Sequence, residues 1–293
     1  GLIRLVTLGY GTIESIPVYH YSPGSSVARI ITTPPAKMPF SCDWCLIGEL
    51  NYPPEIYSYE CVSPEDLVEF IAGKWRTNLV FLDGVEPGAL PESRELVAKL
   101  KSSGIDVGVR TQGFKELSVT GSFVVVDYIP EGYTAAGARL KVLKSLEKLV
   151  KSDVYLEVHV YLDRPLPESL APVIDVVDRE IPIHVFIRDA RDWEIMRLER
   201  SLSGRLDYLY IHSQVLSKLE TRCPACGSFI ALRDEGVLLR LELSDDGKCP
   251  VCGKPIPFGG SLSKETKGSL RRESRGETIW YHPRALPLEK SRC

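Results

Sequence analysis

The sequence predicts an α/β fold in which a full or partial (β/α) barrel is followed by a small metal-binding ribbon. Short β-rich runs alternate with helical patterns from about residue 27, and most runs are almost continuously apolar, as in parallel strands covered on both faces. The ribbon is predicted by two pairs of closely spaced cysteines that flank a β-rich hairpin. The predicted units are a lead-in segment, the barrel, the ribbon and a basic, flexible tail, over residues 1–26, 27–213, 214–260 and 261–293.

The predicted strands are runs rich in valine, isoleucine and aromatic residues. They cover residues 27–33, 78–83, 106–111, 123–128, 154–162, 182–188 and 206–212. Helices are predicted between them, over residues 64–75, 92–103, 134–151, 166–179 and 192–203. Ser63 and Pro64 supply a cap and a first-turn proline to the first helix, and Gly104 follows the second.

The amino-acid composition limits which classes of protein the chain can belong to. The chain has 293 residues, of which 44% are hydrophobic and 26% charged, so it can bury a sizeable core and is not disordered throughout. No apolar run approaches the roughly 20 residues of a membrane helix, and the first residues lack a secretory signal, so we expect a cytoplasmic protein without a membrane partner. The net charge of −3 does not predict nucleic-acid binding. The exception is the tail, where Arg271, Arg272, Trp280 and Tyr281 are residue types that contact RNA.

Four cysteines form the most specific motif, because the turn C-P-x-C-G occurs twice. The pairs are Cys223 with Cys226, and Cys249 with Cys252. Two thiolates at this spacing face one ion, and the glycine after each pair permits a left-handed turn. Four sulfurs complete a closed tetrahedral site, which predicts a structural Zn²⁺; a rubredoxin-like single iron uses the same ligands and stays the alternative. The ion would stabilise a ribbon too small for a core of its own.

Three further cysteines lie before the first predicted helix. Cys42 and Cys45 form a C-x-x-C pair, and Cys61 follows sixteen residues later. In a reducing compartment, such cysteines are typically metal ligands or redox groups. Further candidates lie in the loops after the predicted strands, where a (β/α) barrel gathers its reactive groups, or on the strands themselves, as do Glu157 and His184. These candidate site residues are Gly84, Glu86, Pro87, Arg110, Thr111, Asp127, Glu157 and His184.

Several segments resemble one known family. The stretch SIPVYHYSPGS at residues 15–25, the strand VARIITT and the pair around Asp43 and Trp44 resemble radical S-adenosylmethionine proteins related to pyruvate formate-lyase activating enzyme, with the AmmeMemoRadiSam-system branch as the nearer match. The resemblance extends to about residue 258 through SPEDLVEF, Glu86–Pro87, Asp127, IPIHV and YLYIHS. It implies a partial barrel with a [4Fe-4S] cluster that cleaves S-adenosylmethionine to a 5′-deoxyadenosyl radical. An electron donor and an unknown substrate would be its partners.

The resemblance also implies where the cofactor binds. Glu86 in Gly84-Val85-Glu86-Pro87 would meet the methionyl ammonium group, and Arg110 and Thr111 stand where the branch has a cofactor-facing turn. We expect Asp127, Glu157 and His184 to complete this site. No residue is assigned a catalytic role.

The chain departs from the family at two positions. The family motif is C-x-x-x-C-x-x-C, and Met38 stands at its first cysteine. A neutral thioether is a poor replacement for a thiolate in an iron–sulfur site. Cys61 precedes the first barrel helix, so we expect it on the same rim as Cys42 and Cys45, where it would supply the third sulfur. Ile129 stands where the branch usually has a lysine, which removes a carboxylate partner.

Three interpretations follow. The first is a radical enzyme, in which Cys42, Cys45 and Cys61 bind the cluster. The second is a non-catalytic binding or scaffold protein that has lost the cluster and retains a structural zinc. The third is a C-x-x-C redox pair. The polar residues on the strands also have a structural interpretation, as buried ion pairs or, for His184, as a hydrogen-bonded core histidine.

Overall fold

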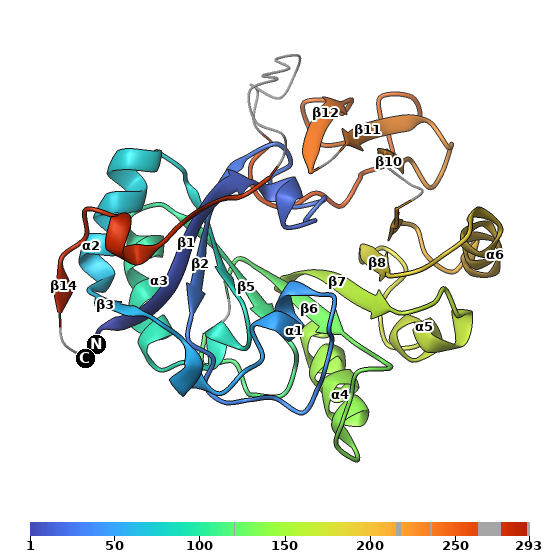
Figure 1. Cartoon of the computed structure of the whole chain (residues 1–293). Helices are drawn as coiled ribbons and strands as arrows, with labels where there is room; N and C mark the ends of the chain where they lie inside the picture. The colour runs from blue at the N-terminus through green and yellow to red at the C-terminus, as the bar shows by residue number, and fades with distance from the viewer. Residues whose placement is uncertain (120, 215–217, 235, 263–276, 292–293) are drawn as a thin grey trace.

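The computed structural model describes residues 1–119, 121–214, 218–234, 236–262 and 277–291, and its centre is a large, mostly parallel sheet (Figure 1). Among the described residues the strand order is β14-β3-β1-β2-β4-β5-β6-β7-β8-β9, with β13 added on β1. From β2 to β9 every pairing is parallel and follows chain order. In the described chain β9 pairs only with β8, so the sheet is open and the closed form of the predicted barrel is not seen.

The parallel strands agree closely with the predicted ones. They are β2 (Ser26–Thr32), β4 (Leu79–Asp83), β5 (Asp106–Thr111), β6 (Phe123–Tyr128), β7 (Tyr155–Leu162), β8 (Ile183–Ile187) and β9 (Leu209–His212). The central ones are buried along nearly their whole length, which explains their continuous apolar runs.

The helices follow the expected alternation with local differences. They are α1 (Leu46–Glu49), α2 (Pro64–Phe70), α3 (Glu92–Ser102), α4 (Ala138–Val150), α5 (Pro167–Ile174) and α6 (Asp192–Leu202). Ser63 caps α2 by accepting a hydrogen bond from the Asp66 amide at 3.0 Å. Helix α4 begins later than predicted because Gly137, at φ 75°, is in a left-handed conformation. Helix α5 contains Pro172 and ends before the predicted residue 179.

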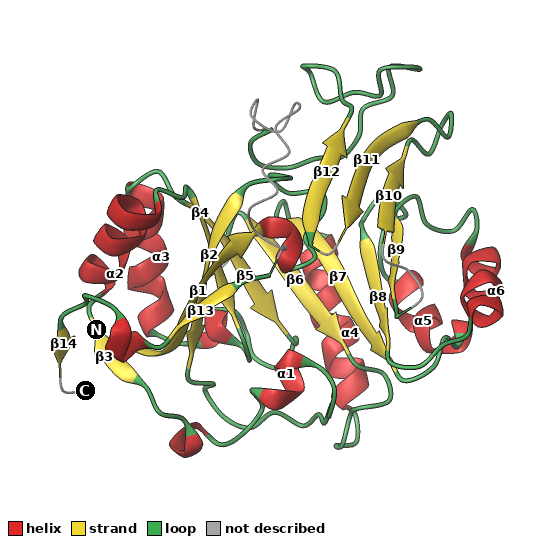
Figure 2. Cartoon of the chain, turned by 45° about the horizontal axis from the view of Figure 1, so that its top comes forward, coloured by secondary structure: helices red, strands yellow, loops and turns green. Residues whose placement is uncertain are grey.

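The two faces of the sheet are covered differently. On one face, side chains such as Val126 and Val158 pack against Leu146 of α4 and Leu170 of α5. On the opposite face, here called the inner face, Phe81 and Phe123 pack against residues 13–21 near the N-terminus. Figure 2 shows helices α4 to α6 on the outer side of these strands and strands β10 to β12 beyond the inner side. Part of the inner face is therefore covered by residues 13–21 rather than by helices α4 to α6.

The N-terminal segment and the tail belong to the sheet, which differs from the predicted lead-in and flexible tail. β1 (Ile3–Thr12) pairs antiparallel with β2 and with β3 (Glu60–Val62). From the tail, β13 (Ile279–Tyr281) pairs with β1, and β14 (Lys290–Ser291) pairs with β3. Trp280 lies over Arg29 and so packs on the sheet, whereas Arg271 and Arg272 lie outside the described residues.

The predicted ribbon contains a separate antiparallel sheet of β10 (Lys218–Arg222), β11 (Phe229–Asp234) and β12 (Val237–Leu241). No helix in the described part of the chain is both long and apolar enough to cross a membrane.

Candidate metal centre and polar cavity

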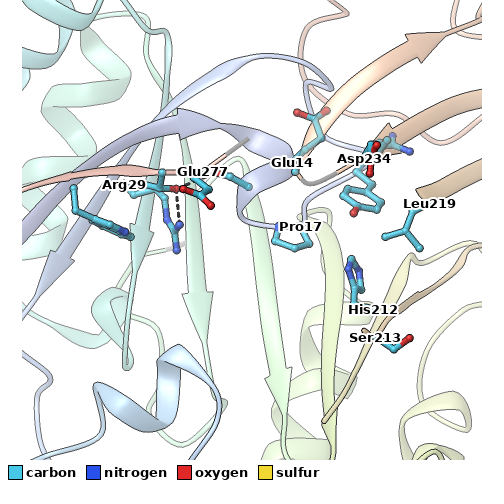
Figure 3. A pocket seen from close by; sticks show the side chains of 14 residues that line it. Glu14, Pro17, Arg29, His212, Ser213, Leu219, Asp234 and Glu277 are labelled. Carbon is cyan, nitrogen blue, oxygen red and sulfur yellow. Dashed lines mark hydrogen bonds between the residues drawn. The ribbon is translucent and has the colours of Figure 1, made fainter. Parts of the chain in front are cut away.

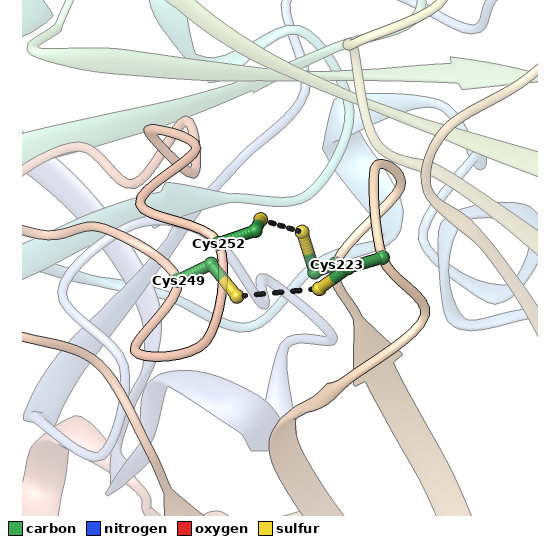
Figure 4. A group of neighbouring side chains, drawn as sticks. Cys223, Cys249 and Cys252 are labelled. Carbon is green, nitrogen blue, oxygen red and sulfur yellow. Dashed lines mark hydrogen bonds between the residues drawn. The ribbon is translucent and has the colours of Figure 1, made fainter.

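The four ribbon cysteines converge on one point (Figure 4). Their sulfur atoms all lie within 4.8 Å of one another, with Cys223 and Cys252 at 3.6 Å and Cys226 and Cys249 at 3.7 Å. A tetrahedral ion with metal–sulfur bonds of about 2.3 Å requires sulfur separations of about 3.8 Å. The arrangement therefore fits a metal ion such as zinc or iron, as the sequence predicted.

The turns around the metal centre also have the predicted form. Gly227 and Gly253 have φ values of 71° and 75°, and their amides donate to the carbonyls of Cys223 and Cys249 at 2.8 and 2.9 Å. Ser228 was not predicted; its hydroxyl oxygen lies 3.1 Å from the Cys226 sulfur and 3.0 Å from the Cys249 sulfur. A hydroxyl in this place can donate to a thiolate and orient it.

Two of the metal-site cysteines also belong to the apolar cluster through which the ribbon packs on the large sheet. Cys223 and Cys249 are buried in one cluster with Ile230 of the ribbon and with Tyr208 and Tyr210 from the end of the sheet. Since this ribbon core is small, loss of the metal ion would leave the ribbon weakly held.

Cys42, Cys45 and Cys61 are not brought together at one point. Cys42 and Cys45 form a disulfide with each other. Cys61 is buried in β3, between Arg4 of β1 and Ser291 of β14. Within the described residues, the ribbon cysteines are the only three or more cysteine, histidine or acidic side chains gathered closely enough for one ion. The expected three-sulfur site of Cys42, Cys45 and Cys61 is therefore not assembled.

The Met38 side chain is buried among apolar side chains and does not face a cluster site. It is 4% exposed and belongs to the same apolar cluster as Cys45 and Ile129. Asn51 holds this loop, because its side chain accepts from the Met38 amide at 2.8 Å and donates to the carbonyls of Met38 and Phe40. Met38 thus fills the core beside Cys45.

Glu86 is buried and already fully hydrogen-bonded. Its carboxylate accepts from the Thr111 hydroxyl at 2.7 Å and from the amides of Phe114 and Lys115 at 2.6 and 3.2 Å. Burial raises its pKa, while these hydrogen bonds oppose the shift. Pro87 and Gly84 are buried next to it, and Gly84 has a φ of 104° that favours glycine. The carboxylate fixes the loop that follows β5.

Arg110 and Asp127 belong to a chain of buried charges on the inner face. Arg110 donates from Nε to Asp83 at 2.6 Å and from Nη1 to Asp127 at 2.7 Å, and Arg29 donates from Nε to Asp83 at 2.9 Å. Burial favours neutral Asp83, but the charges of Arg110 and Arg29 hold the pKa of this carboxyl well below its usual range. Burial raises the pKa of Asp127 to about 7, against the charge of Arg110. Thus two guanidinium groups share two carboxyl groups.

Glu157 and His184 form a second buried network. Glu157 accepts from the amides of Tyr19 and His20 at 3.0 and 2.8 Å, and its Oε2 lies 2.7 Å from Nε2 of His184. Nδ1 of His184 lies 3.0 Å from Nε2 of His212. Burial raises the pKa of Glu157 and lowers those of both histidines well below their usual value, so the imidazoles are neutral.

Of the predicted cofactor residues, Arg110, Asp127, Glu157 and His184 lie on neighbouring parallel strands, and their side chains make their hydrogen bonds and ion pairs within the protein. Their register on successive parallel strands explains the proximity, since Asp127 pairs with His159 and His159 with His184 across β6, β7 and β8. The structural interpretation given above for these residues accounts for each of these contacts.

A cavity of about 680 Å³ lies where the inner face is open (Figure 3). Arg29 of β2 and His212 of β9, the two ends of the parallel run, both line it. The remaining polar lining comes from residues far apart in the sequence, chiefly Glu14, Arg233, Asp234 and Glu277. These residues were not predicted, because their proximity depends on the ribbon and the tail folding back over the sheet. The sequence offers one signal for them: a charged residue in an otherwise apolar, β-rich segment, such as Arg233 in FIALRD.

Comparison with known proteins adds no family to this description. No family model matches the sequence, and no curated protein matches it.

Proposed function

We propose that the chain is a non-catalytic binding protein on a fold similar to that of radical S-adenosylmethionine enzymes, with a structural zinc ion in its ribbon. The observation that carries the proposal is the separation of the cysteines: Cys42 and Cys45 are bonded to each other, and Cys61 lies in β3, paired between β1 and β14. Three thiolates around one cluster are what the radical chemistry requires.

The inner face supports the same proposal. Glu86, the residue expected to meet the methionyl ammonium, already accepts three hydrogen bonds, and Arg110 lies between two carboxyl groups. Binding of S-adenosylmethionine at Arg110 would require its buried ion pairs to break, which costs roughly 3–5 kcal/mol for each uncompensated charge.

Zinc fits the ribbon site because a closed set of four thiolates leaves no open coordination position. The ion would be held by Cys223, Cys226, Cys249 and Cys252, and the Ser228 hydroxyl would donate to one of its two neighbouring sulfurs, those of Cys226 and Cys249. When bound, zinc supplies folding free energy to the ribbon rather than chemistry.

Metal analysis of protein purified without oxygen tests the proposal. We expect a single zinc ion per chain and no iron or sulfide, and we expect Cys223→Ser to lose the zinc. The matched control is the double variant Cys42→Ser with Cys45→Ser, which should retain it. Incubation of reconstituted protein with S-adenosylmethionine and a strong reductant should yield no 5′-deoxyadenosine. An iron–sulfur cluster that depends on Cys42 and Cys45, together with that product, would restore the enzymatic interpretation.

A further inference from the structure

A second cavity, here called the lysine pocket, opens beyond the carboxyl ends of the parallel strands. Its volume of about 350 Å³ lies within the range of roughly 300–1,000 Å³ typical of ligand pockets. Its walls are residues 36–39 after β2, residues 114–115 after β5, and residues 135–138 with Lys141, which follow β6 and begin α4. It shares no lining residue with the cavity on the inner face. In open α/β sheets this edge is where ligands bind.

The three walls of the lysine pocket are tied to one another and to the core. The Thr134 amide donates to the Pro39 carbonyl at 3.1 Å, which joins the segment after β6 to the segment after β2. The Phe114 ring stacks on the Phe40 ring with 6.0 Å between their centroids, which joins the segment after β5 to the same loop. The Phe114 amide also donates to buried Glu86 at 2.6 Å. The pocket is therefore shaped by backbone segments that are held in place.

Each wall of the lysine pocket carries one lysine. These are Lys37, Lys115 and Lys141, and all three are exposed. None of them forms an ion pair with a residue that the structure describes, where lysine ion pairs occur elsewhere. The lining holds no aspartate or glutamate, and Glu116, the next residue after Lys115, lies outside it. The pocket therefore gathers three positive charges without a negative group in its lining.

Helix α4 supplements this positive charge, because it begins at the pocket. Gly137 and Ala138 at its start line the pocket, and no side chain caps the helix. The amides of a first helical turn carry partial positive charge. Since Ala135, Ala136 and Gly137 have no long side chains, a ligand held by the lysines can also approach this backbone.

The rest of the lining is largely apolar. It includes Met38, Pro39 and Phe114, of which Met38 and Phe114 are buried. The ligand that fits both parts has an anionic group and an apolar body. A phosphate monoester carries about 1.5 to 2 negative charges at neutral pH and three acceptor oxygens, so it can accept from all three ammonium groups. A carboxylate has one charge and two oxygens, and so matches the three lysines less well.

We propose that the lysine pocket binds a small phosphate monoester, whose phosphate is held by Lys37, Lys115 and Lys141 and whose apolar body lies against Pro39 and Phe114. This inference rests on the proposed function, because it names the ligand class of a binding protein. An extended polyanion is disfavoured by the net charge of −3 and would leave the apolar wall unused.

Calorimetric titration of the full chain with phenyl phosphate and a series of unbranched alkyl phosphates tests the proposal. The alcohol and the carboxylic acid with the same apolar body, and inorganic phosphate, are the comparison ligands. We expect at least one ester to bind about tenfold or more tightly than each of its comparison ligands, and to weaken as salt is raised, because exposed charges are screened. Absence of binding by the whole series at millimolar concentration, or equal binding by a comparison ligand, would overturn the proposal.

The variant Lys141→Gln assigns the phosphate group, since it removes one positive charge and keeps a good helix former in α4. It should weaken the ester by about tenfold and leave binding of the alcohol unchanged. Lys144→Gln is the matched control, because Lys144 is exposed about one turn further along the same helix and lies outside the lining. Equal weakening by both variants, or tighter binding of a single-stranded RNA oligonucleotide than of any ester, would contradict the pocket and indicate a polyanion along α4.

These titrations do not depend on zinc content or on cleavage of S-adenosylmethionine. Their failure therefore leaves the proposed function standing, and a cluster found by metal analysis would leave the titration result unchanged.

Discussion

Glu86 shows how an acid beside a proline can serve structure alone. Its φ of 49° is left-handed, a conformation that costs a non-glycine residue roughly 1–3 kcal/mol. The hydrogen bonds from Thr111, Phe114 and Lys115 offset this cost by tying the loop after β5 to the carboxylate. The motif that resembles a cofactor-binding segment therefore has a complete set of internal partners.

Asp83 is the residue on which the buried charges of the inner face depend. It is 1% exposed and accepts from both Arg29 and Arg110. In Asp83→Asn, the buried guanidinium groups of Arg29 and Arg110 lose the carboxylate that they share. We therefore expect the free energy of unfolding to fall by about 3–5 kcal/mol. Urea denaturation monitored by circular dichroism measures the change.

Glu147→Gln is the control for this variant, because it breaks the exposed ion pair with Lys151 and should leave stability unchanged. Equal stabilities of Asp83→Asn and the unsubstituted chain would mean that the charge chain adds nothing to the fold.

Glu14 should make stability depend on pH. Burial raises its pKa from 4.5 to about 7, although the charge of Arg233 and the Gly24 amide oppose the shift and Glu157 adds to it. The folded chain therefore holds a proton that the unfolded chain has released between these values. Stability is complete below about pH 4.5 and is lost as pH rises toward 7, by at most about 1.4 kcal/mol per pH unit for one group.

Glu14→Gln removes this dependence, so the difference in unfolding free energy between variant and unsubstituted chain should grow in favour of the variant from pH 5 to pH 7. Denaturation at a series of pH values measures it, with Glu199→Gln, on the exposed side of α6, as control. A difference that stays constant over this range would refute the shifted pKa.

At the scale of elements, Gly48 fixes the loop that carries Cys42 and Cys45. A Cβ at this position of α1 would lie 1.7 Å from the Cys42 carbonyl oxygen, which is backbone and cannot move aside cheaply. We expect Gly48→Ala to lower the melting temperature by several degrees, consistent with about 1–3 kcal/mol for overpacking.

Gly73→Ala is a matched control within the helical turn at 71–75, since its added Cβ meets nothing within 4 Å. It should be neutral or stabilising, by up to about 1 kcal/mol. Scanning calorimetry of both variants compares them directly, and similar melting temperatures would mean that the loop rearranges freely around residue 48.

The sequence was sufficient for those elements whose signal is local. The parallel strands and the cysteine turns were predicted nearly to their ends, because apolar runs and C-P-x-C-G turns are set by neighbouring residues. The strands β13 and β14 were not predicted, since each depends on a partner distant in the chain. For the same reason Cys61 was placed on a shared rim with Cys42, whereas it lies in β3 beside β1 and β14.

At the scale of the whole molecule, the ribbon that carries the metal centre also contributes Arg233 to the wall of the cavity. This residue of β11 packs its guanidinium over the Tyr19 ring at 4.3 Å and donates to the Tyr19 carbonyl, so the ribbon forms one wall of the cavity. Thr12 adds a further link by donating to the Gly236 carbonyl at 2.7 Å. No motif predicts such a site, because its residues meet only after the ribbon has docked.

Removal of the metal should therefore open the cavity as well as unfold the ribbon. Treating the protein with a zinc chelator removes the folding free energy that the ion supplies, and we expect the ribbon to become sensitive to protease within residues 218–258 while β4 to β8 stay protected in hydrogen exchange. The double variant Cys42→Ser with Cys45→Ser, treated in the same way, should respond like the unsubstituted chain, because its substitutions lie outside both the ribbon and the cavity lining. Chelation that releases the metal but leaves the ribbon protected would show that the ribbon is held by its contacts with Tyr19, Tyr208 and Tyr210, and that the ion is not needed for the wall it forms.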